Sequence, residues 1–145
     1  MVYPVSETTQ RDGVCVETIT PAPGLPGTDA AALQELALRI ADELGVIGVL
    51  AVELMQARDG RIVVNELAMR PHNTGHWSIE GARTSQFANH IRAVLDLPLG
   101  SPEMTSPVAV MTNVLGGAEK DLTEVLRHVF TRDRKIINDI MHHFR

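Results

Sequence analysis

The stretch VIGVLAVELMQARDGRIVVNELAMRPHNTGHW, residues 46–77, contains the pattern that decides the fold. Two apolar runs, VIGVLAVEL and RIVVNEL, are separated by MQARDG, and the Asp59-Gly60 pair is a strong signal for a β-hairpin turn. Both runs are short and rich in β-branched residues, which favours strands over helices. The stretch therefore predicts a mostly buried antiparallel pair of strands that leads into a polar loop.

Two glutamates occupy matching positions in this predicted hairpin. A turn centred on Asp59-Gly60 places Glu53 directly opposite Glu66, where like charges destabilise the pair. A hard cation relieves that repulsion, and Mg²⁺ accepts one or two protein carboxylates together with substrate phosphate oxygens. We therefore predict a magnesium site at Glu53 and Glu66. The alternatives are that both side chains splay into solvent, or that a one-residue bulge breaks the register.

The loop RPHNTGHW concentrates polar donors directly after the second strand. Arg70 offers a planar fork for a carboxylate, bicarbonate or phosphoryl oxygen, and His72 and Asn73 supply further donors for an anion. Ordinary structural roles compete with this interpretation: His72 and His76 can cap a helix, Asn73 can be a turn residue, and Trp77 is usually a core residue. Two histidines four residues apart also suggest zinc, but the NTG between them forms helix poorly and does not align them.

Elements before the hairpin complete an α+β domain. GVCVETI, residues 13–19, predicts a strand, and the stiff loop TPAPGLPG follows it. AALQELALRIADELG, residues 31–45, has the apolar spacing of an amphipathic helix, with Thr28 or Asp29 as its N-cap and Gly45 as its stop. This helix is expected to pack beside the antiparallel pair.

Beyond the loop, helical spacing of apolar residues predicts one helix from Ser78 to Leu95, which LDLPLGSP ends. PVAVMTNVLGG predicts a short strand. The last 28 residues are charged, contain no glycine or proline, and carry two apolar stripes that predict amphipathic helices. Such stripes need a partner, so we expect a homo-oligomer in which the tail is buried. The stripes consist of Leu122, Val125, Leu126, Val129 and Phe130, and of Ile136, Ile137, Ile140, Met141 and Phe144.

Composition narrows the class of protein. A chain of 145 residues with 44% hydrophobic content is sufficient for one compact domain. A formal charge of −5 and the lack of a basic cluster argue against nucleic-acid binding. No apolar run approaches the roughly 18–20 residues of a membrane span. The single cysteine, Cys15, is expected to be a small buried side chain, and with no signal-like N-terminal pattern it favours a cytoplasmic location.

An ordered set of segments resembles the carboxyaminoimidazole ribonucleotide synthetases, which are ATP-grasp enzymes of purine biosynthesis. The segments are VYPVSETTQRDGVC, PAPGL, GVIGVLAVELM, NELAMRPHNTGHW, TSQFANHIRAVLDLPLG and PVAVMTNVLG. The resemblance implies the second half of an ATP-grasp module, an antiparallel sheet with packed helices, followed by a helical C-terminal tail. Residues 1–100 would be the partial ATP-grasp domain with the metal and substrate loop. Residues 101–145 would be a partial or rearranged C-terminal domain.

The same resemblance implies roles for the candidate residues. Glu53 and Glu66 match the family's magnesium-binding glutamates, while Arg70, His72 and Asn73 match the segment that faces bicarbonate and the aminoimidazole substrate. The implied reaction uses ATP to activate bicarbonate as carboxyphosphate, whose carboxyl group passes to the amine of aminoimidazole ribonucleotide. Paired carboxylates for a metal and a cation for developing negative charge suit phosphoryl transfer.

Departures from the family leave alternatives open. Intact members begin with a nucleotide-fold-like domain and an ATP-lid subdomain, neither of which is in this sequence, and the end RHVFTRDRKIINDIMHHFR does not follow the family's phosphate-binding pattern. We therefore expect a fragment of the ligase bearing half of an active site. The alternatives are a catalytically silent binding or assembly module, or a fragment of another ATP-grasp carboxylase or ligase.

Overall fold

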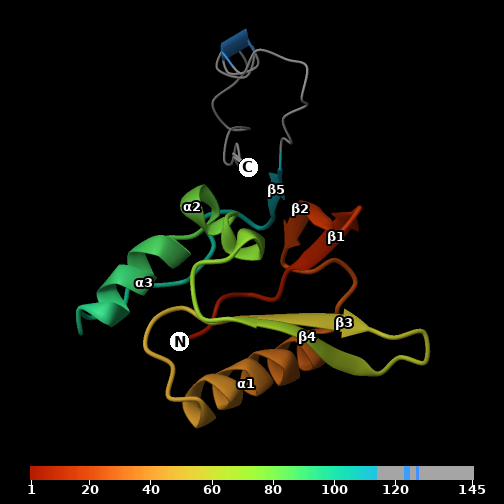
Figure 1. The fold of residues 1–145 in the computed structure, drawn as a ribbon, viewed down its shortest axis with the longest axis horizontal. Helices are drawn as coiled ribbons and strands as arrows, with labels where there is room; N and C mark the ends of the chain where they lie inside the picture. The colour runs from red at the N-terminus through yellow and green to blue at the C-terminus, as the bar shows by residue number, and fades with distance from the viewer. Residues whose placement is uncertain (114–122, 125–126, 128–145) are drawn as a thin grey trace.

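The computed structural model describes residues 1–113, 123–124 and 127. Two antiparallel sheets and three helices in this part of the chain confirm the α+β class, and Figure 1 shows their arrangement. Apart from residues 123–124 and 127, the predicted helical tail lies outside the described residues, and so do all the residues of its two apolar stripes. The elements run in the order β1 (Glu7–Arg11), β2 (Val14–Thr20), α1 (Gly27–Glu43), β3 (Ala51–Gln56), β4 (Ile62–Ala68), the 3₁₀ turn η1 (Asn73–Gly75), α2 (Ser78–Gly81), α3 (Gln86–Val94) and β5 (Ala109–Thr112).

One sheet has three strands in the order β1-β2-β5. Its central strand β2 confirms the strand predicted from GVCVETI, and β1 was not predicted. Asp12 and Gly13 join β1 to β2 with φ angles of 51° and 79°. Positive φ at both central residues is what a type I′ two-residue hairpin loop requires. The Asp-Gly signal was therefore present a second time in the sequence, ahead of β2.

The second sheet is the β3-β4 hairpin, whose loop is one residue longer than predicted. The Ala57 amide donates to the Arg61 carbonyl at 2.8 Å, and the Gly60 amide donates to the Ala57 carbonyl at 2.9 Å. Gly60 has a φ of 85°. This is the three-residue loop in which a turn is followed by a left-handed residue. The loop is centred on Asp59, so the register beside it is offset by one from the predicted register.

A β-bulge restores the predicted pairing further along the hairpin. Leu54 pairs with Val64, and the next pair is Glu53 with Glu66, so Asn65 is the extra residue. The predicted position of Glu53 opposite Glu66 is therefore confirmed. The bulge that seemed a threat to the register in fact produces the pairing, because an unbulged strand would place Asn65 opposite Glu53.

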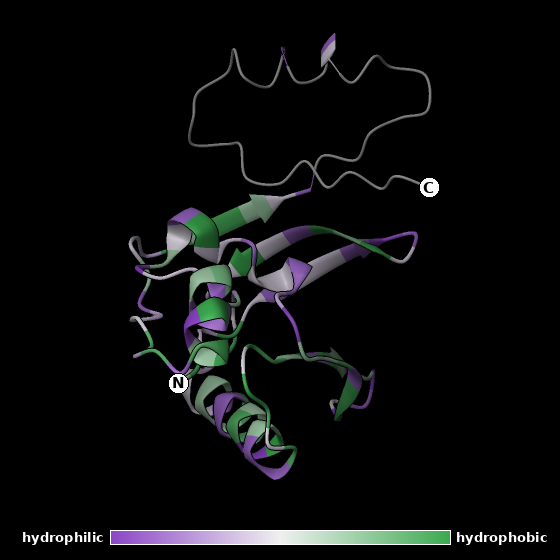
Figure 2. Cartoon of the chain, turned by 60° about the vertical axis from the view of Figure 1, so that its left-hand side comes forward, coloured by the Kyte–Doolittle hydropathy of each residue, from purple (hydrophilic) through white to green (hydrophobic). Residues whose placement is uncertain are grey.

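The expectation of a mostly buried hairpin was wrong. Val63 and Val64 are 45% and 49% exposed, and Ala68 is the one buried residue of β4. In the described part of the chain β3 and β4 form a two-stranded sheet, so each strand has one paired edge. Helix α1 runs alongside this hairpin in Figure 1, but it contains no buried residue. Apolar and polar residues alternate around α1 in Figure 2, as expected for an amphipathic helix.

Helix α1 begins earlier than its sequence signals suggested. Its N-cap is Pro26, not Thr28 or Asp29, because the Pro26 carbonyl already accepts hydrogen bonds from the amides of Asp29 and Ala30 at 3.0 and 2.9 Å. The C-terminal stop was predicted correctly. The helix ends at Glu43, and Gly45 follows with a φ of 59°, the left-handed conformation that glycine adopts most readily.

The single helix predicted from Ser78 to Leu95 is two helices, α2 and α3. Between them Ala82 is extended and forms a β-bridge with Met104, while the Arg83 amide donates to the Glu103 carbonyl at 2.8 Å. Pairing with this distant segment replaces helical hydrogen bonds. Helix α3 then starts at a new cap, because the Ser85 hydroxyl accepts from the Ala88 amide at 3.2 Å.

The buried core lies between α2 and the three-stranded sheet. Trp77, Ala82 and Met111 form its centre, and Tyr3 and Met104 pack against them. The Trp77 side chain is 5% exposed, which confirms the ordinary interpretation of that residue. The ring of Tyr3 meets it edge-on, with centroids 6.1 Å apart and planes at 85°, a favourable aromatic arrangement. This core fixes the far end of the loop that begins at Arg70.

Candidate functional site

Glu53 lies between the two sheets. Its Oε2 accepts a hydrogen bond from the Asn65 amide at 2.7 Å, and its Oε1 accepts from Gln10 of β1 at 3.4 Å. The bulge places the Asn65 side chain within reach of Glu53. Both donors are neutral carboxamides, and Glu53 makes no salt bridge with any described residue. The carboxylate is therefore oriented by the protein while its negative charge stays available to a cation.

The Glu66 carboxylate lies near two residues of the loop, Arg70 and His72. Its Oε1 lies 3.7 Å from Nη2 of Arg70 and 4.0 Å from Nε2 of His72. The side chains of Glu66 and Arg70 are 49% and 61% exposed. An exposed pair at this separation is weak, so Arg70 is not committed to Glu66 and can turn to an incoming anion. The structure thus brings Glu66, Arg70 and His72 together beside the partner strand that carries Glu53.

His72 has the capping role that the sequence suggested as its ordinary structural alternative. It is the N-cap of η1, and its ring Nδ1 accepts from the Thr74 amide at 3.4 Å and lies 3.0 Å from the Thr74 hydroxyl. A backbone amide can only donate, so the neutral ring keeps its Nδ1 lone pair toward Thr74 and carries its proton on Nε2. The Nε2–H group is consequently the one that faces Glu66 and the mouth of the site.

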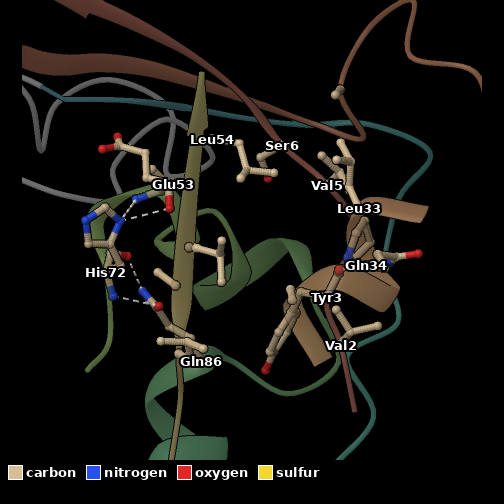
Figure 3. Close-up of a pocket in the computed structure, with 18 of the residues that line it drawn as sticks. Val2, Tyr3, Val5, Ser6, Leu33, Gln34, Glu53, Leu54, His72 and Gln86 are labelled. Carbon is tan, nitrogen blue, oxygen red and sulfur yellow. Dashed lines mark hydrogen bonds between the residues drawn. The ribbon is translucent and has the colours of Figure 1, made fainter. Parts of the chain in front are cut away.

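A buried carboxamide holds the backbone of His72. Gln86, the first residue of α3, is 3% exposed; its Oε1 accepts from the His72 amide at 2.9 Å, and its Nε2 donates to the His72 carbonyl at 2.7 Å (Figure 3). A Cβ at Gly75 would lie 2.5 Å from that Oε1, so any larger residue there would displace the Gln86 carboxamide. The Ser78 hydroxyl donates to the Gly75 carbonyl at 2.6 Å and accepts from the Gln86 amide at 3.0 Å.

Asn73 is oriented by a different residue. Its Oδ1 accepts from Nδ2 of Asn113 at 2.9 Å, and the same Nδ2 donates to the Cys15 carbonyl at 2.7 Å. Sequence reasoning missed Gln86, Ser78 and Asn113. The sequence held one signal for Gln86. This polar residue directly follows the capping Ser85, at a helix position where the apolar spacing predicts a buried side chain.

Glu53 and the loop residues His72, Thr74 and Gly75 line an open cavity of about 600 Å³, whereas Glu66, Arg70 and Asn73 are not among its lining residues. Residues of the N-terminal segment, α1 and β3 supply an apolar wall that includes Val2, Val5 and Leu33, and Glu53 and His72 lie at its polar side (Figure 3). An apolar wall with a few convergent polar groups is typical of a small-molecule site.

The donor set fits magnesium better than zinc. The described residues contain no group of three or more histidine, cysteine, aspartate and glutamate side chains that could hold a metal, whereas zinc sites have three or four protein ligands. A pair of carboxylates such as Glu53 and Glu66 is a protein donor set that suits Mg²⁺, whose shell phosphate oxygens and water can complete. The histidines of the loop are not arranged as a pair of ligands, since Nδ1 of His72 binds Thr74 and the His76 ring stacks on Phe87 with centroids 5.5 Å apart.

The model of the ATP-grasp domain matches residues 1–87 of this chain. The chain therefore belongs to the ATP-grasp family. Similar curated proteins include N5-carboxyaminoimidazole ribonucleotide synthases: that of Mycobacterium tuberculosis is 60% identical over 133 residues, which are 90% of this chain and 31% of the relative. The Bacillus subtilis protein is 42% identical over 122 residues, 84% of this chain and 32% of the relative.

Solved structures give the same result. The N5-carboxyaminoimidazole ribonucleotide synthetase of Thermus thermophilus is similar with a TM-score of 0.74 and 42% identity, over 86% of this chain and 34% of that one. The Aspergillus clavatus synthase, in complex with ADP and 5-aminoimidazole ribonucleotide, has a TM-score of 0.74 and 39% identity over 80% of this chain and 31% of its own. The resemblance drawn from NELAMRPHNTGHW is confirmed. The chain spans about a third of the length of the curated relatives that it matches.

No helix in the described ranges is long and apolar enough to cross a membrane.

Proposed function

We propose that this chain forms the part of an ATP-dependent ligase that binds magnesium and bicarbonate for the carboxylation of 5-aminoimidazole ribonucleotide in the cytoplasm. The observation that carries the proposal is the convergence of Glu66, Arg70 and His72 beside Glu53, on a chain 60% identical to N5-carboxyaminoimidazole ribonucleotide synthase. Carboxylates for a cation and donors for an anion lie on adjoining parts of one hairpin and its exit loop.

The two glutamates would hold Mg²⁺ from one side. When bound, Mg²⁺ supplies neutralisation and alignment of the ATP phosphates. Asn65 and Gln10 fix the oxygens of Glu53 by hydrogen bonds, so this carboxylate needs little reorganisation when a cation arrives. Preorganised groups of this kind contribute strongly to the stabilisation of charge during phosphoryl transfer.

Arg70, His72 and Asn73 would hold the anion. An oxygen of bicarbonate attacks the γ-phosphorus, the bond to the β-γ bridging oxygen breaks, and ADP leaves as carboxyphosphate forms. The amine of the aminoimidazole then attacks the carboxyl carbon, phosphate departs, and the nitrogen loses a proton. The guanidinium of Arg70 and the Nε2–H of His72 stabilise the oxygens that carry the negative charge in these steps.

Binding of Mg²⁺ with ADP tests the cation site, and isothermal titration of the chain provides the measurement. We expect weak binding, because substrate and protein groups share the metal shell, and at least a tenfold loss of affinity in Glu53→Gln and in Glu66→Gln. Glu43→Gln is the matched control, since Glu43 is an exposed glutamate at the end of α1. Unchanged binding in both site variants would contradict the assignment.

A second candidate is a binding or assembly module that has no activity by itself. The exposed apolar side chains of the β3-β4 hairpin favour it, because contiguous apolar surface marks interaction sites. We expect the chain alone not to hydrolyse ATP in the presence of bicarbonate and aminoimidazole ribonucleotide. Turnover by the purified chain that disappears in Arg70→Ala would rule out this candidate.

A further inference from the structure

Asn113 links the three-stranded sheet to the loop that carries the candidate anion site. Its backbone amide donates to the Val16 carbonyl at 2.9 Å, which extends the pairing of β5 with β2 by one residue. Its side chain is 6% exposed and reaches the Cys15 carbonyl and the Asn73 carboxamide. A residue 40 positions along the chain from Asn73 therefore makes direct contact with it.

Hydrogen-bond chemistry fixes the orientation of both carboxamides. The carbonyl of Cys15 can only accept, so Asn113 must present its Nδ2 amino group on that side. The same amino group points its second proton at Asn73, at 2.9 Å. Asn73 must then offer Oδ1 to Asn113, which directs the two N–H donors of Asn73 away from it. No described residue accepts a hydrogen bond from those donors, so they remain for solvent or a ligand.

We propose that Asn113 is a positioning residue that makes Asn73 an N–H donor to a bound anion; this rests on the proposed function. The ligand class is a small oxyanion, bicarbonate or the carboxyl group made from it, because an amide N–H attracts such oxygens and an amide carbonyl repels them. A reversed Asn73 carboxamide would present its oxygen to the anion. Asn113 thus selects between an attractive and a repulsive contact without touching the anion.

A further observation separates this role from simple packing. Oδ1 of Asn113 is buried and has no hydrogen-bond partner in the described structure. An unsatisfied buried acceptor is destabilising, and an apolar side chain of similar size would avoid that penalty. The hydrogen bonds that this side chain makes are therefore those of its amino group, to the Cys15 carbonyl and the Asn73 carboxamide.

The test replaces the donor by an acceptor of the same shape. In Asn113→Asp the carboxylate cannot donate to Asn73 and attracts its amino group, so Asn73 should reverse. Asn89→Asp is the matched control, because Asn89 is a 4% exposed carboxamide that bonds Tyr3 and Gly100 instead of the loop. Asn113→Leu is a second variant that removes both donor bonds without burying a charge.

Two signals are read on the full chain by nuclear magnetic resonance. The side-chain amide resonances of Asn73, identified by their loss in Asn73→Asp, should shift in Asn113→Asp and in Asn113→Leu and stay in place in Asn89→Asp. Bicarbonate, titrated as the probe and followed through the loop amides, should bind at least tenfold more weakly to Asn113→Asp and about threefold more weakly to Asn113→Leu.

The Asn73 resonances and the bicarbonate affinity together distinguish a failure of the positioning role from a failure of the proposed anion site. Asn73 resonances that do not move in either Asn113 variant would overturn the positioning role, as would bicarbonate affinity equal to that of Asn89→Asp. If the unaltered chain binds no bicarbonate, the proposed anion site fails, and the Asn73 resonances still decide whether Asn113 orients that residue. The fluorescence of Trp77, the single tryptophan, reports whether each variant is folded.

Discussion

Replacing Gly75 with alanine tests the clamp that Gln86 places on the backbone of His72. The added Cβ would stand 2.5 Å from Oε1 and 2.8 Å from Cδ of Gln86, well inside van der Waals contact. The φ angle of Gly75 lies outside the left-handed region that favours glycine, so alanine is not strained by the backbone itself. The steric conflict with the Gln86 carboxamide therefore accounts for the expected effect.

The magnitude follows from what Gln86 loses when it moves. Its two hydrogen bonds to His72, at 2.9 and 2.7 Å, are each worth about 1 kcal/mol net, and a buried amide left without partners costs about 1–3 kcal/mol more. The better intrinsic conformational preference of alanine offsets less than about 1 kcal/mol. We expect the free energy of unfolding to fall by about 2–4 kcal/mol.

Urea unfolding, followed by the fluorescence of Trp77, measures this change. A loss of that size moves the midpoint down by on the order of 1–2 M for a domain of this length. Gly27→Ala is the matched control, because a Cβ at Gly27 meets no atom within 4 Å and its φ is ordinary. If Gly75→Ala unfolds at the same urea concentration as Gly27→Ala, the clamp does not exist as described.

Three further predictions concern stability. Ser85→Ala should lower the free energy of unfolding by about 1 kcal/mol in urea, because α3 loses the acceptor at its N-terminus. Gly48→Ala should cost about 2 kcal/mol or more, since φ is +119° and the Cβ would lie 2.8 Å from Nδ1 of His90; a neutral result would contradict this. Burial raises the pKa of Tyr3 above 10.0, against a smaller lowering by the hydrogen bond from Asn89. The contribution of Tyr3 to the free energy of unfolding is therefore constant below about pH 10. It falls as the pH rises further, because the tyrosine of the unfolded chain loses its proton first. An absorbance titration of this single tyrosine should give a higher midpoint in the folded chain than in urea, and equal midpoints would refute the shift.

The parts of the fold that were predicted correctly depend on local signals. β2, the hairpin strands and the end of α1 at Gly45 follow from β-branched runs, an Asp-Gly turn and a left-handed glycine. Each signal acts within a few residues of the structure it sets. The same kind of signal at Asp12 and Gly13 would have revealed β1, had the turn been read as a hairpin.

The parts that failed depend on partners far away in the chain. The break between α2 and α3 arises where Ala82 pairs with Met104, and no local pattern marks it. The exposure of Val63 and Val64 depends on which element covers the hairpin, not on their own apolar character.

In the candidate site, too, the residues with local signals were predicted and those that depend on distant partners were missed. Glu53 and Glu66 were placed by pairing arithmetic, and the loop residues were placed by their position after a strand. Gln86 and Asn113 were missed because their functions are hydrogen bonds to the loop from 14 and 40 residues away. The sequence alone does not show which distant group a carboxamide side chain will bond.

The bulge at Asn65 gives the hairpin one spare residue, and this bears on changes of length. If Asn65 were deleted, the register beside the turn would carry straight on, and Glu66 would still fall opposite Glu53. The acidic pair would survive the deletion, and only the amide that steadies Glu53 would be lost. The strand can therefore shorten by one residue at this point without turning its carboxylate to the other face, a tolerance that a regular ladder does not have.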